Sequence, residues 1–163
     1  MKKFLSLILI LAVSFACKET KESLNANFIK SEFGDDVALA FQRDACFGEC
    51  PVDKIVISKK GNIYYNGRMF VENQGLFKMA SSKSLEEVIG DLNQMGIKSF
   101  KKEYDGGIAD LPSYRFYVNY KGSQALINAK SDYPEELAKC IYYMKNYIDG
   151  LSVKMKIEEE DFQ

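Results

Sequence analysis

Two cysteines separated by three residues form the most reactive pair of side chains in this sequence. Cys46 and Cys50 lie in the segment RDACFGECPVDK, residues 43–54. Such a pair can exchange disulfides, hold a metal or close a disulfide across a turn. A zinc site would need Cys46, Cys50, Cys140 and a carboxylate, because the chain has no histidine. Structural zinc usually binds cysteine and histidine at spacings such as C-x2-C, so we expect no metal.

The residues around the pair favour a structural disulfide over a redox site. Redox pairs usually have the spacing C-x-x-C at the start of a helix, beside positive charge that stabilises a thiolate. Here Asp44 and Glu49 flank the thiols, and their charge opposes a thiolate. Gly48 lets the chain curl, and Pro51 favours an extended Cys50. Such a bridge would contribute about 2 kcal/mol, with the redox site as the alternative.

A second place for chemistry is the segment YDGGIADLP, residues 104–112. Its two adjacent glycines could position Asp105 and Asp110 as the paired carboxylates of a hydrolase. Without histidine, Ser-His-Asp and Cys-His catalysis within this chain is excluded. We favour the alternative that both aspartates turn the chain, Asp110 just before Pro112. Neither a phosphate-binding loop nor a dinucleotide fingerprint is present, so we expect no cofactor.

The chain also has ten tyrosines, more than the core can accept by periodicity. We predict that Tyr64, Tyr65 and Tyr117 contribute to an exposed aromatic patch on the open face of a sheet. Aromatic rings with a polar tip suit a glycan or a protein partner. Solvated strand tyrosines without a binding role are the alternative.

Hydrophobic periodicity predicts the elements that must position these residues. Alternation predicts strands, and Asn66-Gly67 predicts a hairpin turn between two of them. Apolar residues at helical spacing follow a capping box at Ser84 and Glu87 and predict a first helix. Pro134 suits the first turn of a last helix, whose apolar stripe includes Cys140. We therefore expect an α+β fold, an antiparallel meander with two helices packed on one face. The predicted strands cover residues 37–42, 54–58, 63–65, 68–71, 76–79, 114–120 and 123–128, and the predicted helices residues 84–95 and 134–151.

The first residues, MKKFLSLILILAVSFAC, have the pattern of a secretory signal peptide. Two lysines precede a short apolar run and small residues, so we expect residues 1–16 to be removed. The ending SFAC resembles the lipobox of bacterial lipoproteins, although Ser14 stands where leucine is usual. That resemblance implies that Cys17 is acylated and anchors the chain to a membrane. Export also supports the Cys46–Cys50 disulfide, because exported proteins meet oxidising conditions.

The remaining chain divides into a tether, one domain and a tail. Residues 17–36 are polar and read as the lipidated cysteine with a flexible tether, residues 37–152 as one α+β domain and residues 153–163 as an acidic tail. Removal of Lys2 and Lys3 leaves 20 of the 22 basic residues against 23 acidic ones, a net charge near −3. A weakly acidic chain has no electrostatic reason to bind nucleic acid.

Several of these motifs together resemble the DUF6438 family of bacterial envelope proteins. The resemblance covers residues 37–150: the segment RDACFGECPVDKIVISKKGNIYYNG, an acid-rich helix, YDGGIADLP, a hairpin and a last helix. Its most specific mark runs from Cys46 to Pro51. Asp53 departs from the family pattern, which often has tyrosine there, so a family site at this position would be altered. The resemblance implies an envelope location and a domain of unknown function, without an activity.

Two classes of function follow. The first is a lipid-anchored, non-catalytic envelope protein on the outer membrane that binds a protein or glycan or has a structural role. The second is an envelope enzyme, either a thiol oxidoreductase through Cys46 and Cys50 or a carboxylate hydrolase through Asp105 and Asp110. We favour the first class, because the chain lacks a histidine base and the cysteine pair lacks a redox setting.

Overall fold

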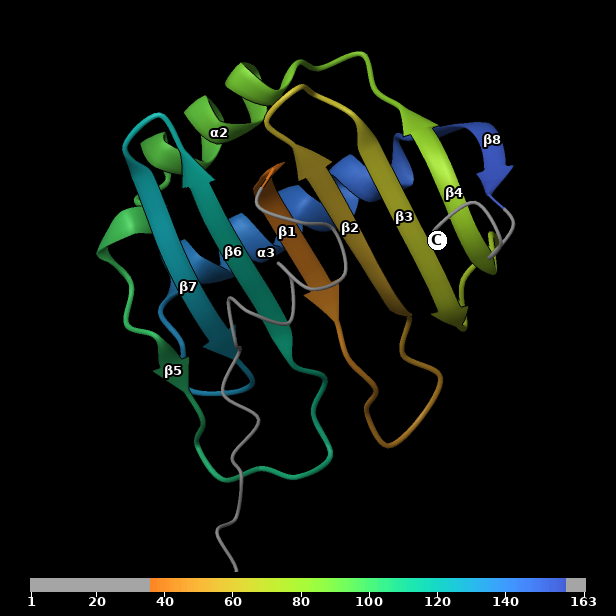
Figure 1. Ribbon diagram of the computed structural model, residues 1–163. Coiled ribbons are helices and arrows are strands. Elements are labelled where there is room, and N and C mark those ends of the chain that lie inside the picture. Colours follow the sequence, from red (N-terminus) through yellow and green to blue (C-terminus); the bar gives the residue numbers. More distant parts are fainter. Residues whose placement is uncertain (1–35, 158–163) are drawn as a thin grey trace, which may run out of the picture.

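Eight strands form one sheet in the computed structural model, which describes residues 36–157 (Figure 1). The order across the sheet is β5-β7-β6-β1-β2-β3-β4-β8, and all neighbours are antiparallel except β5 and β7. The strands are β1 (Val37–Arg43), β2 (Val52–Ser58), β3 (Ile63–Met69), β4 (Gly75–Ala80), β5 (Glu103–Tyr104), β6 (Tyr114–Tyr120), β7 (Ser123–Ala129) and β8 (Ser152–Ile157).

Both helices lie on the same face of this sheet (Figure 1). They are α2 (Leu85–Gln94) and α3 (Glu135–Asp149), and a short 3-10 turn, η2 (Ile97–Ser99), follows α2. Their apolar stripes and the sheet side chains that face them form one core. The predicted α+β fold is confirmed. Within residues 36–157, neither helix has the length and apolar character needed to cross a membrane.

Alternation along the central strand β1 explains how the sheet separates two environments. Leu39 and Phe41 face the helices and are fully buried, whereas Ala40 faces the open side. Ala40 belongs there to a small apolar cluster with Val56 and Tyr117, because residues opposite one another on paired strands share a face. The helix-covered face therefore holds the main core, and the open face holds a second, smaller one.

Helix α2 begins where the capping box predicts. The Ser84 side chain accepts a hydrogen bond from the Glu87 N–H, and the Glu87 carboxylate accepts one from the Ser84 N–H at 2.7 Å. These two bonds satisfy amides that the first helical turn leaves without partners. Gly96, with φ +82°, ends the helix in the left-handed conformation that glycine adopts without a steric penalty.

The predicted turn at Asn66-Gly67 is wrong. Both residues pair inside β3, Gly67 with Asp53 on one side and Gly75 on the other. The chain turns afterwards, at residues 70–74. A side chain at Gly67 would meet the Asn73 carbonyl oxygen at 2.0 Å, so this glycine permits a close backbone approach and does not supply a positive φ.

The folded part also extends past residue 152, where the sequence predicted the acidic tail to begin. Residues 152–157 form β8, which pairs with β4 at the edge of the sheet. Its alternation of Val153, Met155 and Ile157 with lysines is a strand pattern that a charged edge strand often shows. The two-residue strand β5 was also missed. The predicted signal peptide, Cys17, almost all of the tether and the rest of the tail lie outside the described residues.

Candidate functional site

Four loops gather at one end of the sheet (Figure 1). Two of them connect antiparallel neighbours, β1 with β2 and β3 with β4, whereas the other two lead from β5 to β6 and from β7 to α3. We call this region the loop end. In register, Arg43 lies beside Asp53 and Tyr114, and Asp53 beside Gly67, so each of these strand ends meets the others there. The loop end consists of residues 44–51, 70–74, 105–113 and 130–134.

Cys46 and Cys50 form the disulfide that was favoured from sequence, with 5.7 Å between their Cα atoms. The closed turn contacts the neighbouring loop through backbone hydrogen bonds. The Phe47 N–H donates to the Asp110 carbonyl at 3.2 Å, and the Asp44 N–H donates to the Ser113 carbonyl at 2.9 Å. The bridge therefore fixes a turn that also docks on residues far away in the sequence.

Cys140 takes no part in this site. It lies on the apolar side of α3 and is fully buried in the core, as the helical stripe predicted. Burial raises the pKa of its thiol to about 11, since the thiolate would lose its hydration there. At neutral pH it is a small apolar core residue.

A buried polar network lies directly under the loop end, between the sheet and the helices. The Arg43 guanidinium donates to Asp53 through Nε at 2.7 Å and also through Nη2. The Tyr65 hydroxyl donates to the same carboxylate at 2.9 Å. Burial and the Asp53 charge raise the pKa of Tyr65, so it stays a neutral donor. For Arg43, burial lowers the pKa, but the bonds and charge of Asp53 outweigh it and the net shift is upward.

Sequence reasoning did not find this network. Asp53 stood out only because it departs from the family pattern. Arg43 and Asp53 stand at equal distances on either side of the cysteine turn, and they pair directly across the β1–β2 hairpin. That symmetry could have revealed the ion pair, because opposite charges placed directly across a strand pair attract. Asp53 therefore neutralises a buried guanidinium, and no side chain at this position faces solvent.

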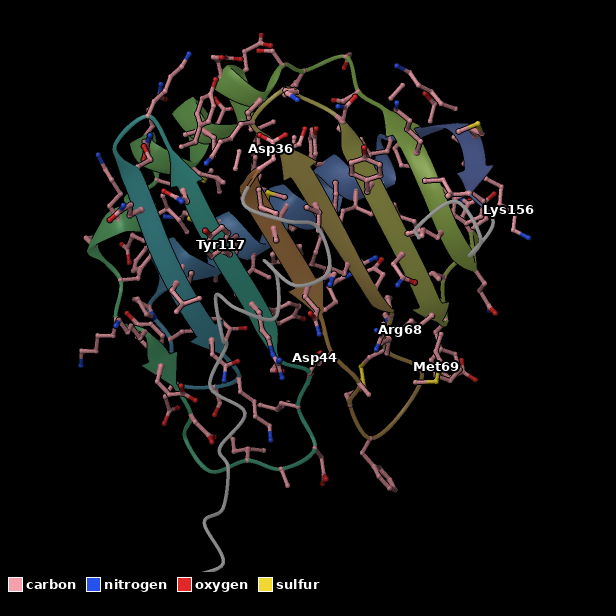
Figure 2. All side chains as sticks on the ribbon, viewed as in Figure 1. Asp36, Asp44, Arg68, Met69, Tyr117 and Lys156 are labelled. Atoms are coloured by element: carbon pink, nitrogen blue, oxygen red, sulfur yellow. A yellow bond between two sulfur atoms is a disulfide. The ribbon has the colours of Figure 1, made fainter. Side chains whose placement is uncertain are left out.

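The three tyrosines predicted as an exposed patch do not share a face. Tyr65 points toward the helices and is 4% exposed, whereas its neighbour Tyr64 alternates to the other side and pairs with Val56. Tyr117 lies on the open face (Figure 2) but is only 8% exposed. Consecutive strand residues point to opposite faces, so Tyr64 and Tyr65 could not both belong to one patch.

Asp105 and Asp110 both lie exposed in the third loop of the loop end. The Asp105 carboxylate accepts a hydrogen bond from the Gly107 N–H at 2.9 Å, a side-chain turn of the kind aspartate often forms. Asp110 supplies its backbone carbonyl to Phe47. Both contacts shape the loop, as the favoured interpretation expected. Within residues 36–157 the structure contains no cluster of three or more histidine, cysteine or carboxylate side chains that could hold a metal.

The loop end also carries exposed apolar side chains that sequence reasoning did not single out. Phe47 is 89% exposed, at the tip of the disulfide turn. Phe70 is 51% exposed and has φ +53°, a backbone conformation that costs a bulky residue about 1–2 kcal/mol. Met69, beside Arg68 at the end of β3 (Figure 2), is 46% exposed. Ile108 and Leu111 complete the set at 50% and 39%. Large apolar residues within predicted turns and loops were the sequence signal that could have revealed these exposed side chains.

A hollow of about 690 Å³ lies away from the loop end, against the outer side of α3 beside Tyr142 and Tyr143. Most of its polar groups already have partners: Glu135 pairs with Lys139, and Lys83 and Tyr143 pair with Asp91 nearby. Asp91 accepts from Lys83 at 2.7 Å and from the Tyr143 hydroxyl at 2.8 Å. The Tyr147 hydroxyl, which also lines the hollow, is buried without a partner. A specific ligand site needs several polar groups that turn toward the ligand. Because most of the polar groups here are paired, the loop end is the stronger candidate.

Comparison with known families places most of this fold in one of them. The family model of DUF6438, described as a domain of unknown function, matches residues 37–148. The match runs from β1 into α3 and leaves out β8. Comparisons with curated proteins and with solved structures found no match.

Proposed function

This chain belongs to the DUF6438 family of domains of unknown function, and from that premise we propose that it is an exported binding module of the bacterial envelope. In this proposal Cys17 carries the lipid that anchors it to the outer membrane, and the domain binds a partner without catalysing a reaction. The family description supplies no activity, so the proposal depends on the chemistry of the loop end.

One observation carries the binding role, namely the way the structure presents Phe47. Its ring is 89% exposed, although a free aromatic ring in water is unfavourable by the hydrophobic effect. The turn beneath it is closed by a disulfide and bonded to the neighbouring loop. An exposed aromatic side chain on a fixed backbone turn suits a binding hot spot, because the turn loses little conformational freedom when the ring is buried.

The export and anchoring part of the proposal has independent support. Disulfides persist in oxidising compartments and are rare in the cytosol, and the sequence begins with a signal-like segment that ends at Cys17. Strand β1 begins beside Asp36, at the end of the sheet opposite the loop end (Figure 2).

The enzymatic alternatives have less support. Pro51 and strand β2 follow Cys50 directly, so the cysteine pair lacks the helix N-terminus that lowers a thiol pKa in redox proteins. The Asp105 carboxylate accepts the Gly107 N–H within its own turn, a contact that the role of a turn residue explains without catalysis.

The test of the proposal is the chemistry of the first mature residue. Full-length protein and a Cys17→Ala variant are expressed in a bacterium that processes lipoproteins, and their masses and membrane fractions are compared. We expect a lipid mass on Cys17 and membrane association that the variant loses. Cleavage of the wild-type chain without a lipid, with equal membrane association of both forms, would contradict the proposal.

A further inference from the structure

We propose that the loop end docks a basic, apolar-anchored segment of another protein. This inference rests on the proposed binding function and specifies its surface and the chemistry of its partner. The docking residues are Phe47, Phe70, Ile108 and Leu111, from three of the four loops, and Met69 at the end of β3.

The distribution of exposed apolar side chains points to this surface. Five of the eight large apolar side chains that are exposed among residues 36–157 lie at the loop end or where β3 enters it. The remaining three are Tyr142 on α3 and Val153 and Met155 on the edge strand β8. Single exposed apolar residues are ordinary, but a gathered set marks interaction sites on soluble domains.

These side chains stand on supported loops. The disulfide closes the turn under Phe47. Asp44, at the start of the same loop, accepts hydrogen bonds from Gln42 at 2.6 Å and from the Ser113 hydroxyl at 2.8 Å, and lies 2.8 Å from Arg115. This network connects the first loop with the third. Surfaces organised before binding lose less entropy on association, which favours affinity.

Charge identifies the class of partner. The four loops contain six carboxylates against one ammonium group, that of Lys130. Asp44 is neutralised by Arg115, and the exposed Arg68 beside Met69 adds a second positive charge. Carboxylates still outnumber the cationic groups, so the loop end stays acidic around its apolar centre. Such a surface repels anionic lipid headgroups and nucleic acid, and it attracts lysine and arginine beside apolar anchors. The six carboxylates are those of Asp44, Glu49, Glu72, Asp105, Asp110 and Asp132.

The first experiment selects partners by chemistry alone. A displayed library of random 12-residue peptides is panned against the immobilised full-length protein in detergent micelles. We expect enrichment of sequences that combine lysine or arginine with aromatic or large aliphatic residues. The combined change Phe47→Ser and Phe70→Ser should weaken binding of the selected peptides at least tenfold. The matched control, Tyr142→Ser with Met155→Ser, removes exposed apolar groups elsewhere and should leave binding unchanged.

A charge variant and a single fluorophore complete the test. Glu49→Gln with Glu72→Gln should weaken binding severalfold and reduce its salt dependence. The chain has no tryptophan, so Phe47→Trp gives one reporter, whose emission should shift to the blue on addition of a selected peptide. The same shift in phosphatidylglycerol–phosphatidylethanolamine vesicles without peptide would show membrane insertion and overturn the proposal.

Other outcomes overturn it as clearly. Enriched peptides without basic residues, or binding that survives the Phe47 and Phe70 changes, would contradict the proposed partner or surface. Because all of these variants retain Cys17, the result is independent of the lipid-mass test. Loss of lipidation with intact peptide binding would refute the anchor alone.

Discussion

The two ends of the sheet are built in different ways. The loop end has loops of five to nine residues that carry exposed apolar side chains and mostly negative charge. The opposite end, which we define by the turns at residues 59–62, 81–84 and 121–122, is short and carries lysine, serine, glycine and asparagine. Its glycines Gly61 and Gly122 have φ near +80°, as short turns between strands often require.

The difference lies in what holds each end in place. At the opposite end, local bonds such as the capping box at Ser84 are joined by side-chain contacts between distant residues, among them Asn93 with Ser123 at 2.8 Å. Glu86 adds surface contacts: hydrogen bonds from the Tyr120 hydroxyl and Lys121 lower its pKa to about 2. These groups are exposed, so they contribute little to stability. The loop end instead depends on a disulfide, a buried ion pair and backbone bonds between distant loops.

This contrast shows that the strongest stabilising contacts, the disulfide and the buried ion pair, lie at the loop end. Long loops lose more conformational entropy when they are ordered than two-residue turns do. Loops that only connect strands would not require a disulfide and a buried ion pair, and they would not expose Phe47. The predictions below test whether the loop end is the part that depends on long-range constraint.

The largest effect is expected from Asp53→Asn. This change leaves the Arg43 guanidinium buried without its countercharge, and such losses typically cost about 3–5 kcal/mol. Chemical denaturation with circular dichroism measures the free energy of unfolding. As a matched control, Arg43→Met, Asp53→Leu and Tyr65→Phe together remove the whole network, and should cost much less. A loss below about 1 kcal/mol for Asp53→Asn would mean that the network does not support the loop end.

A smaller effect is expected from Cys46→Ser with Cys50→Ser. Opening a five-residue loop should lower the free energy of unfolding by about 2 kcal/mol and leave the domain folded. Peptide binding should weaken further than stability suggests, because Phe47 loses its rigid support.

Thiol counting checks the same prediction. The wild-type domain should show one thiol, that of Cys140, and only after unfolding. The control Cys140→Ala should show none in the domain. A thiol from Cys46 or Cys50 in the natively exported protein would contradict the structural role of the bridge.

The smallest effect is expected at the opposite end. Ser84→Ala removes the side-chain cap of α2 and should cost about 1 kcal/mol, whereas Ser82→Ala, at an exposed position nearby, should cost almost nothing. Peptide binding at the loop end should stay at the wild-type level in both variants. If Ser84→Ala weakened binding as much as the cysteine changes do, the two ends would not be independent.

Much of this architecture could be predicted because it depends on local rules. Alternation located six of the eight strands, and helical spacing with the capping box at Ser84 located both helices. The Cys46–Cys50 disulfide was predictable for the same reason, since close spacing, glycine and proline act within one turn. The wrong prediction at Asn66-Gly67 arose because a residue that resembles a turn signal is needed for a contact with another segment. Gly67 has the sequence of a turn but occupies a strand, because the 70–74 loop packs against it.

The sequence by itself determined the α+β class, the helix boundaries, the disulfide turn and the buried position of Cys140, since each depends on periodicity or on residues a few positions apart. Only the tertiary structure decided which side chains meet. Arg43, Asp53 and Tyr65 join across three strands, and Phe47 and Ile108 reach one end from loops about sixty residues apart in sequence. Strand order and register bring such residues together, and these depend on the summed packing of the whole sheet against its helices, which no short segment specifies.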